Sequence, residues 1–340
     1  MKQPPRKYDI TQCALYKCRN KNRLEQLLCL ESGGLKQINT IIRYHSFEID
    51  KKHSSEKRKI TAPNSTLKLV QARILNLLQN IIRPDWLVSS QKGKCYIDNG
   101  KAHITGRYVL TIDIKKFYDN CTREPVYQFF VTKLKTAPDI AKILTDIVTY
   151  DSGIPTGCPT SQIIAFYAYY DMFSEINDVA KRSGCHFTLY VDDMTFSSSE
   201  TFSPKVLMRE IDCILRKYGH KPKYKKVNYY SAADYKPITG TVVTPQQTLA
   251  VPNSLQKTIY EGFQEIKDAS MKPVCSAEEE KRLLSLKGQI QSARNIEEGK
   301  FPEILRISSQ IKTSEQHLDS KKRVHRKHKG KIRIKPKASR

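Results

Sequence analysis

Three aspartates in two segments have the residue type and spacing for metal-dependent chemistry. In the first segment, Leu110 and Ile112 alternate with polar positions and precede Asp113. This pattern predicts a strand with one core face, and Asp113 near its end on the other face. In the second segment, Asp192 and Asp193 interrupt an apolar run. The run predicts a hairpin with both acids at its tip.

Adjacent carboxylates at a tight turn repel each other, so a half-buried site of this kind needs a compensating cation. Mg²⁺ prefers oxygen ligands and usually keeps only a few protein carboxylates, so three aspartates can hold a pair of ions. Two ions about 4 Å apart can activate a 3′-hydroxyl and stabilise a leaving pyrophosphate. For each segment alone, the alternatives are ordinary turn chemistry at Asp192 and Asp193 and a solubilising or capping role for Asp113.

The elements that position these acids are predicted as a mixed α+β fold. Short β-branched runs mixed with helices between residues 108 and 251 predict a sheet domain. Apolar residues at helical spacing predict a helix over residues 66–83, which Pro84 ends. Three amphipathic stretches predict a small helical module, at residues 254–270, 277–296 and 302–318.

The charge of the chain indicates a polyanionic partner. The 340 residues include 59 Lys and Arg against 34 Asp and Glu, a net charge of +25, while 39% hydrophobic residues suffice for a core and exclude a disordered chain. Residues 321–340 hold 11 of the basic residues and no acid. We interpret them as a phosphate-binding arm or, equally, a disordered solubilising end. Lysines interleaved with tyrosines at residues 217–235 favour a single-stranded nucleic acid track, or else form a solvated loop.

The chain shows no sign of a membrane partner. Its N-terminus lacks the apolar run of a signal peptide, and the longest uncharged stretch, residues 152–170, is interrupted by Pro and Gly. The nine cysteines include no CxxC pair and no zinc spacing. They predict reduced packing residues and a cytoplasmic protein.

Several motifs together resemble those of a family. Residues 190–193 read Tyr-Val-Asp-Asp, residues 153–161 read Gly-Ile-Pro-Thr-Gly-Cys-Pro-Thr-Ser, and a strand aspartate lies upstream of both. Over about residues 56–251 the chain resembles reverse transcriptases, and more narrowly the bacterial retron-type enzymes. This resemblance implies that Asp113, Asp192 and Asp193 bind metal. It also implies that Lys226, in the lysine-rich stretch, protonates pyrophosphate.

The resemblance also implies residues that bind the nucleotide. Residues 56–63 are similar to the family motif whose arginine meets the triphosphate, which makes Arg58 the phosphate clamp. An exposed basic stretch is the alternative. Tyr118 is at the position of the aromatic ring under the sugar, where it would collide with a 2′-hydroxyl and favour deoxynucleotides. Phe117 is expected to be the buried ring of the pair, although both rings can be core.

The loop at residues 153–161 departs from the family pattern. Thr156 replaces a glutamine and Gln162 replaces a proline. Gly157 still permits a close approach of the backbone to a nucleotide. Thr156 and Gly157 are therefore predicted to bind nucleotide, while the side-chain contact of the family glutamine is in doubt.

Two short elements resemble retron motifs. Residues 99–103 resemble the Asn-Ala-x-x-His element, and residues 238–240 resemble the Val-Thr-Gly triplet. The resemblance implies RNA binding by Asn99, His103, Thr239 and Gly240. For His103 a hydrogen-bonded structural role is an alternative compatible with the resemblance.

The resemblance implies a right-hand polymerase: N-terminal segment and fingers (residues 1–107), palm with a small antiparallel sheet (108–251), helical thumb (252–318) and basic tail (319–340). It would use two Mg²⁺ ions and dNTPs to copy part of a cognate non-coding RNA, which is both template and primer, into single-stranded DNA joined to that RNA. It would act in antiphage defence with a separate effector protein. The alternatives are a group II intron or abortive-infection reverse transcriptase, and a non-catalytic RNA-binding scaffold.

Overall fold

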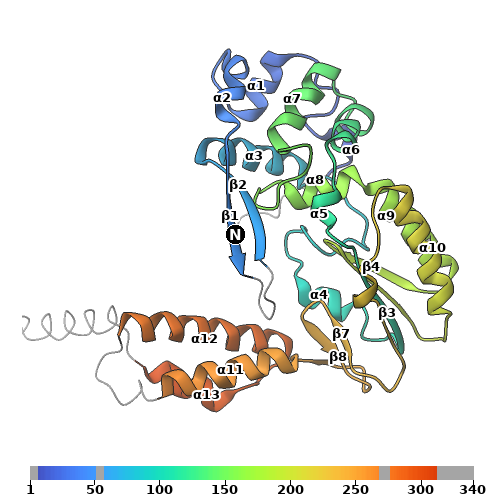
Figure 1. Cartoon of the computed structure of the whole chain (residues 1–340), viewed down its shortest axis with the longest axis vertical. Helices are drawn as coiled ribbons and strands as arrows, with labels where there is room; N and C mark the ends of the chain where they lie inside the picture. The colour runs from blue at the N-terminus through green and yellow to red at the C-terminus, as the bar shows by residue number, and fades with distance from the viewer. Residues whose placement is uncertain (1–6, 51–56, 268–275, 312–340) are drawn as a thin grey trace, which may run out of the picture. The chain divides into compact units, whose positions relative to one another are not determined.

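The computed structural model describes residues 7–50, 57–267 and 276–311. They belong to two compact units. The first comprises the chain up to Thr239 together with residues 245–247, and the second comprises residues 240–244 and the chain from 248 onward. Helices and strands occur together in the first unit, which confirms the predicted α+β class (Figure 1). The basic stretch at residues 321–340 lies outside the described residues.

A four-stranded sheet in the order β4-β5-β3-β6 forms the centre of the first unit. Its strands are β3 (Tyr108–Asp113), β4 (His186–Tyr190), β5 (Asp193–Ser198) and β6 (Asn228–Tyr230), and all neighbouring strands are antiparallel. Leu110 and Ile112 are each 1% exposed, which confirms their place on the core face. Helices α9 (Tyr170–Arg182) and α10 (Pro204–Lys217) pack beside this sheet (Figure 1).

Many of the remaining helices of the first unit contribute to one apolar core with this sheet. Tyr8 and residues near the chain start pack on the same core. The bounds of the remaining helices are η1 (Ile10–Gln12), α1 (Lys21–Leu28), η2 (Gly34–Gln37), α2 (Ile38–Ile41), α3 (Ser65–Leu78), α4 (Tyr96–Lys101), α5 (Phe117–Asn120), α6 (Arg123–Gln128), η3 (Phe129–Lys133), α7 (Pro138–Val148), α8 (Ser161–Ala168) and η4 (Tyr224–Lys226). Strand β7 (Lys236–Ile238) is the last strand of the first unit's main segment, which continues to Thr239.

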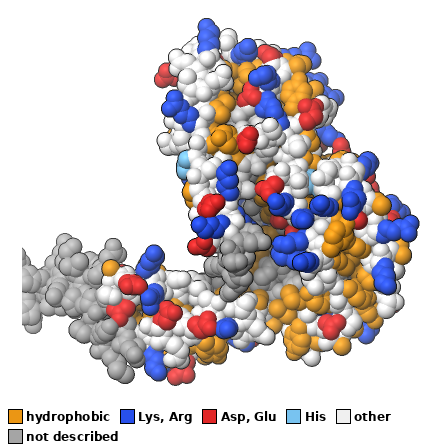
Figure 2. Space-filling model, viewed as in Figure 1, with side chains coloured by type: hydrophobic (Ala, Val, Ile, Leu, Met, Phe, Trp, Pro, Cys, Tyr) orange, Lys and Arg blue, Asp and Glu red, His pale blue; other side chains and the backbone are white. Residues whose placement is uncertain are grey.

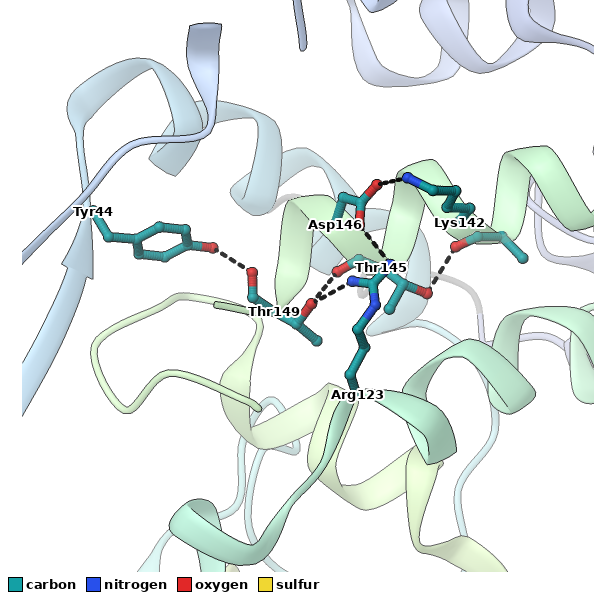
Figure 3. Close-up of polar contacts among 7 residues, drawn as sticks. Tyr44, Arg123, Lys142, Thr145, Asp146 and Thr149 are labelled. Atoms are coloured by element: carbon teal, nitrogen blue, oxygen red, sulfur yellow. Dashed lines mark hydrogen bonds and ion pairs between the residues drawn. The ribbon is translucent and has the colours of Figure 1, made fainter. Parts of the chain in front are cut away.

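A separate hairpin of β1 (Tyr44–Asp50) and β2 (Lys57–Pro63) is attached to the helices at its base. The Tyr44 hydroxyl donates to the carbonyl of Ile147 at 3.1 Å. It also lies 3.5 Å from the carbonyl oxygen of Thr149 (Figure 3). The buried Gln71 amide on α3 donates to the same Tyr44 oxygen and to the Ile147 carbonyl. Because buried polar groups need partners, these bonds fix the base of β1 to α3 and α7.

The predicted helix over residues 66–83 is too long at its C-terminal end. Helix α3 spans Ser65–Leu78 and begins at an N-cap, Asn64, whose side chain accepts from the Leu67 amide. Beyond it, Ile82 donates to the Tyr8 carbonyl, and the Arg83 guanidinium donates to the carbonyls of Ser90 and Gln79. Tertiary bonds therefore end the helix before Pro84 does.

Within its described residues, the second unit contains three helices. They are α11 (Asn253–Ile266), α12 (Ala277–Ile296) and α13 (Pro302–Gln310), following the short paired strands β8 (Thr241–Val243) and β9 (Leu249–Ala250). A capping box between Ser276 and Glu279 starts α12 at the predicted residue. Its apolar stripe, including Leu283, Leu286 and Ile290, is buried. The predicted helical module is thus present within the described residues, while residues 268–270 and 312–318 of the predicted first and third helices lie outside them.

Eight cysteines lie in the described residues and all are free thiols. Cys29, Cys95 and Cys213 are exposed, so the packing role predicted for the cysteines does not hold for these three. No helix in the described part of the chain is both long and apolar enough to span a bilayer.

Candidate active site

The strand pairing brings the three predicted acids to one end of the central sheet. Asp113, the last residue of β3, lies directly opposite Asp193, the first residue of β5. Asp192 lies in the two-residue loop that joins β4 to β5. The predicted strand and hairpin are therefore present, and residues separated by about 80 positions in sequence meet at one edge.

The loop of this hairpin is held in a strained conformation. Val191 has a φ of +61°, in the left-handed region that a β-branched residue rarely adopts. Its amide donates to the hydroxyl of Ser89 at 2.9 Å, and Ser89 is buried. Residues 86–88 also bond the edge of β4, at Leu189. Ser89 was missed by the sequence analysis, because nothing in its local sequence signals a contact 102 residues away.

Burial and mutual repulsion make the two loop acids difficult to ionise. The pKa of Asp193 rises to about 6, because the group is desolvated and Asp192 and Asp113 lie near. The pKa of Asp192 is raised by desolvation and by Asp113, while Lys226 and Arg58 act against this rise. A site that raises the pKa of two carboxylates in this way favours a bound cation.

Lys226 supplies a cation within the chain itself. Its Nζ donates to Oδ2 of Asp113 at 2.7 Å. This hydrogen bond raises the pKa of Lys226, and the charges of the nearby aspartates add to the effect. The predicted catalytic lysine therefore lies within contact of the predicted metal ligands. Figure 2 shows many Lys and Arg side chains on the visible face of the first unit.

Helix α10 anchors the short element η4 that carries Lys226. The Tyr224 hydroxyl donates to Asp212 at 2.9 Å and accepts from Arg216 at 2.8 Å. On the other side, the Lys223 amide donates to the carbonyl of Asp113 at 2.7 Å. These bonds hold η4 between α10 and the end of β3.

Arg58 is on β2, opposite Ile49 of β1, and its side chain is exposed. Its charge opposes the rise in the pKa of Asp192, which places the guanidinium within electrostatic reach of the acids. The planar fork of donors on an exposed guanidinium suits a polyphosphate. The position is consistent with the predicted clamp, and phosphate binding itself stays a prediction.

The two rings that follow β3 differ in burial as expected. Phe117 is 4% exposed and packs with Tyr169, Phe173 and His220, whereas Tyr118 is half-buried. Desolvation and the charge of Asp192 raise the pKa of the Tyr118 hydroxyl, so this ring lies beside the acidic centre. Tyr118 is therefore the ring of the two that can meet a substrate.

The loop after Gly153 packs on the outer edge of β2. The Thr156 hydroxyl donates to the carbonyl of Lys59 at 3.3 Å, and the Gly157 amide donates to that of Thr61 at 3.0 Å. A Cβ on Gly157 would lie 2.6 Å from the Thr61 oxygen. Glycine is thus required here for approach to β2. Nucleotide binding by Thr156 and Gly157 stays a prediction.

The four predicted RNA-binding residues are not gathered on one surface. Asn99 and His103 are each 0% exposed. The Asn99 amide donates to the Thr239 hydroxyl at 2.8 Å, and the His103 nitrogens lie 2.7 Å from the hydroxyls of Ser197 and Thr188. Burial lowers the pKa of His103 to about 3. The geometry of these two residues supports the structural alternative.

Thr239 and Gly240 form a tight turn with positive φ values of 40° and 85°. Glycine accommodates such a conformation readily, and a threonine does not. The Thr239 hydroxyl is already an acceptor for Asn99. RNA contact by these two residues stays a prediction.

The acids suit a hard cation in chemistry but are not preassembled around one. Three carboxylates supply the oxygen donors that Mg²⁺ prefers. Within residues 7–50, 57–267 and 276–311, no three His, Cys, Asp or Glu side chains converge closely enough to hold a metal ion. The donor type and the repulsion between Asp113, Asp192 and Asp193 fit a divalent ion, which would draw their oxygens together.

One family of known proteins matches a segment of this chain that includes the acidic end of the central sheet. The profile of the family described as reverse transcriptase (RNA-dependent DNA polymerase) matches residues 49–269. The chain belongs to this family. The match includes β2, the acidic end of the central sheet and the loop that packs on β2.

The similar reverse transcriptases are retron enzymes, which confirms the predicted resemblance. The Retron Se72 reverse transcriptase of Salmonella heidelberg is 27% identical over 47% of this chain and 42% of its own length. The Retron Ec86 enzyme of Escherichia coli is 26% identical over 60% and 64%, and the Retron Ec48 enzyme of Escherichia coli is 30% identical over 46% and 41%. The matched segments thus span less than two thirds of each relative.

A solved structure of apo telomerase from Candida tropicalis, truncated from its C-terminal domain, is 13% identical. It covers 63% of this chain and 55% of its own, with a TM-score of 0.47. A likeness this slight does not bear on the function of this reverse transcriptase family member.

Proposed function

We propose that the chain is an RNA-directed DNA polymerase of the retron type. It copies part of a cognate structured non-coding RNA into single-stranded DNA, with that RNA as template and primer. The observation that carries the proposal is the pairing of Asp113 with Asp193, with Asp192 in the adjoining loop and Lys226 bonded to Asp113. Family membership and the retron relatives support it.

In this proposal the first unit contains the fingers and palm of a right-hand polymerase. The β1–β2 hairpin belongs to the fingers, the β4-β5-β3-β6 sheet is the palm, and α11, α12 and α13 form the thumb. The exposed Arg58 binds the triphosphate of an incoming dNTP through its planar set of donors. Tyr118 lies under the sugar and excludes a 2′-hydroxyl by contact.

Asp113, Asp192 and Asp193 would hold two Mg²⁺ ions. When bound, the ions would lower the pKa of the attacking 3′-hydroxyl and offset the negative charge of the leaving pyrophosphate. Lys226 exchanges its carboxylate partner for the pyrophosphate and donates a proton to it, as a general acid. In this arrangement the aspartates bind the ions, Lys226 offsets the negative charge of the pyrophosphate, and Arg58 orients the phosphates.

The partners of the proposed enzyme are the RNA, dNTPs, its DNA product and a separate effector protein in cytoplasmic antiphage defence. A basic excess of +25 supports a nucleic acid partner. The effector and the location rest on the retron resemblance alone.

The test begins with the nucleic acid that copurifies with the protein. One short DNA joined to one fixed RNA supports the retron proposal, whereas heterogeneous RNA or none contradicts it. DNA synthesis on that RNA is then compared between the wild type and the double variant Asp192→Ala, Asp193→Ala. Asp178→Ala, on the exposed face of α9, is the matched control. Synthesis by the double variant at the wild-type rate would show that these acids are not catalytic.

A further inference from the structure

Tyr169 is a buried tyrosine at the junction of α8 and α9, away from the strand ends that carry the acids. Its side chain is 2% exposed. The hydroxyl accepts from the amide of Thr122 at 3.0 Å and donates to the carbonyl of Asn120 at 3.1 Å. Burial raises the pKa of this hydroxyl, so it stays protonated and able to donate at neutral pH.

The two backbone groups that Tyr169 contacts lie at the end of α5, the four-residue helix that contains Tyr118. A helix this short has little stability of its own and depends on contacts at its ends. At its start, the Asn120 side chain donates to the carbonyl of Lys115 at 3.0 Å. At its end, the Asn120 carbonyl is bonded by Tyr169. The orientation of Tyr118 is thus set from both ends of α5.

The segment after α5 also supports the loop that packs on β2. The Ile154 amide donates to the Cys121 carbonyl at 3.0 Å, and the Arg123 amide donates to the Ser152 carbonyl at 2.9 Å. The Arg123 side chain contacts Asp146 at 2.5 Å and Thr149 at 3.0 Å (Figure 3). The Tyr169 hydroxyl therefore lies where the end of α5 meets the start of the loop at residues 153–161.

The ring of Tyr169 fixes the same helix from the side. Its centroid lies 6.3 Å from that of Phe117 and 4.6 Å from that of His220, both in edge-to-face geometry. Such ring pairs have preferred orientations, so they restrict the position of Phe117. Phe117 in turn packs against Tyr118 at 5.5 Å.

We propose that Tyr169 is a positioning residue for sugar discrimination: through Asn120, Thr122 and Phe117 it holds Tyr118 at the position where the ring meets the 2′-hydroxyl of a nucleotide. The inference rests on the proposed function, in which Tyr118 is the sugar-contacting ring. It adds a residue that does not touch the substrate but sets how strictly deoxynucleotides are selected.

The experiment compares kcat/KM for a dNTP with that for the matching rNTP, on an RNA template annealed to a short DNA primer. Tyr169→Phe keeps the ring and removes the two bonds of the hydroxyl. We expect the dNTP-to-rNTP ratio to fall about tenfold, since bonds of this kind contribute about 1.4 kcal/mol in total. The fall should come from a gain with rNTP, with kcat for dNTP changed less than about threefold.

Tyr8→Phe is the matched control. The Tyr8 hydroxyl donates to the carbonyl of Leu77 at 2.8 Å, and it has no bond to α5 in the described residues. It should leave the ratio unchanged. A ratio lowered equally in both variants would mean a general loss of packing, and would overturn the positioning role.

Two further variants separate the inference from the proposed function. If Tyr118→Ala does not lower the ratio, the sugar contact in the proposed function is wrong and the positioning role is overturned with it. If Tyr118→Ala lowers the ratio and Tyr169→Phe does not, only the positioning role is overturned. Should Tyr169→Phe fail to fold, Asn120→Ala removes the side-chain bond to Lys115 at the start of α5 and must itself lower the ratio. Absence of any DNA synthesis by the wild type contradicts the proposed function and the inference together.

Discussion

Lys226 and Asp113 form an ion pair with Nζ to Oδ2 of 2.7 Å across 113 residues of sequence. The carboxylate is largely buried, with its side chain 15% exposed, whereas the lysine side chain is 58% exposed. The buried partner therefore depends on the exposed one for charge compensation, while the lysine can leave to meet another anion. This asymmetry suits a group that moves between a protein carboxylate and a phosphate.

Replacement of Lys226 tests this pair. We expect Lys226→Met to lower kcat for dNTP incorporation about 100-fold, because a general acid typically contributes at least that much. Lys226→Arg keeps the charge but is a poor proton donor, so it should restore less than a tenth of the rate. Single-turnover incorporation measures both. Lys225→Met, on the same short helix, is the control and should retain nearly the full rate.

Replacement of Asp193 should stabilise the metal-free protein while it abolishes synthesis. Because the folded-state pKa of about 6 exceeds the ordinary value of 3.8, ionisation of Asp193 reduces stability as the pH rises through this interval. Asp193→Asn should therefore raise the free energy of unfolding by about 1 to 2 kcal/mol near neutral pH and by almost nothing near pH 4. Urea denaturation measures this difference. A destabilised variant at neutral pH would contradict the repulsion described above.

Protonation of the buried His220 should contribute to the loss of folding stability at low pH. The ring is 3% exposed, neither nitrogen has a hydrogen-bond partner among the described residues, and burial lowers its pKa to about 4. Between this value and the ordinary 6.5, only the unfolded chain binds the proton, so stability falls as the pH is lowered. His220→Phe should reduce that slope by about 1.4 kcal/mol per pH unit. At neutral pH it should be at least as stable as the wild type.

Equal slopes for the two proteins would show that His220 is not neutral in the folded state. His103 is buried as well and titrates in the same direction, with a pKa of about 3. The variant should therefore retain part of the acid sensitivity. Unfolding by urea at several pH values between about 4.5 and 6.5, compared between the wild type and His220→Phe, isolates the contribution of His220.

Replacement by alanine should lower the stability of the protein at Gly157 and raise it at Gly288. A Cβ at Gly157 would lie 2.6 Å from the Thr61 oxygen and 3.0 Å from Ile60, so β2 must shift. We expect Gly157→Ala to lower stability by about 1 to 3 kcal/mol and to raise KM for dNTP, since Arg58 is on β2. Gly288, inside α12, has no atom within 4 Å of such a Cβ. Gly288→Ala should stabilise by about 1 kcal/mol without effect on KM.

The parts of the site that could be predicted from sequence are those with a local signal. Alternation of apolar residues indicated β3 and its buried face, and two adjacent acids within an apolar run indicated the β4–β5 hairpin. Apolar residues at helical spacing indicated the helix over residues 277–296, which is α12. Each of these signals depends on only a few neighbouring residues, so it can be recognised without knowledge of the fold.

The remaining features depend on contacts between distant segments. Ser89 bonds Val191, and Tyr169 bonds Asn120 and Thr122, yet no spacing in their neighbourhoods indicates these partners. The predicted end of α3 is wrong because Arg83 and Ile82 bond Ser90 and Tyr8 instead of continuing the helix. At such places, hydrogen bonds to distant segments outweigh the local helix propensity.

His103 joins β4 to β5 through Thr188 and Ser197, each at 2.7 Å. Side chains alternate between the two faces of a strand, so a shift of one residue along β5 would turn Asp193 into the apolar core and bring the fully buried Met194 opposite Asp113. The His103 imidazole thus helps to hold the register of β4 and β5. This register decides which side chains of β5 lie on the face of the proposed site. A misaligned hairpin would thus remove these acids from the site although no acidic residue had changed.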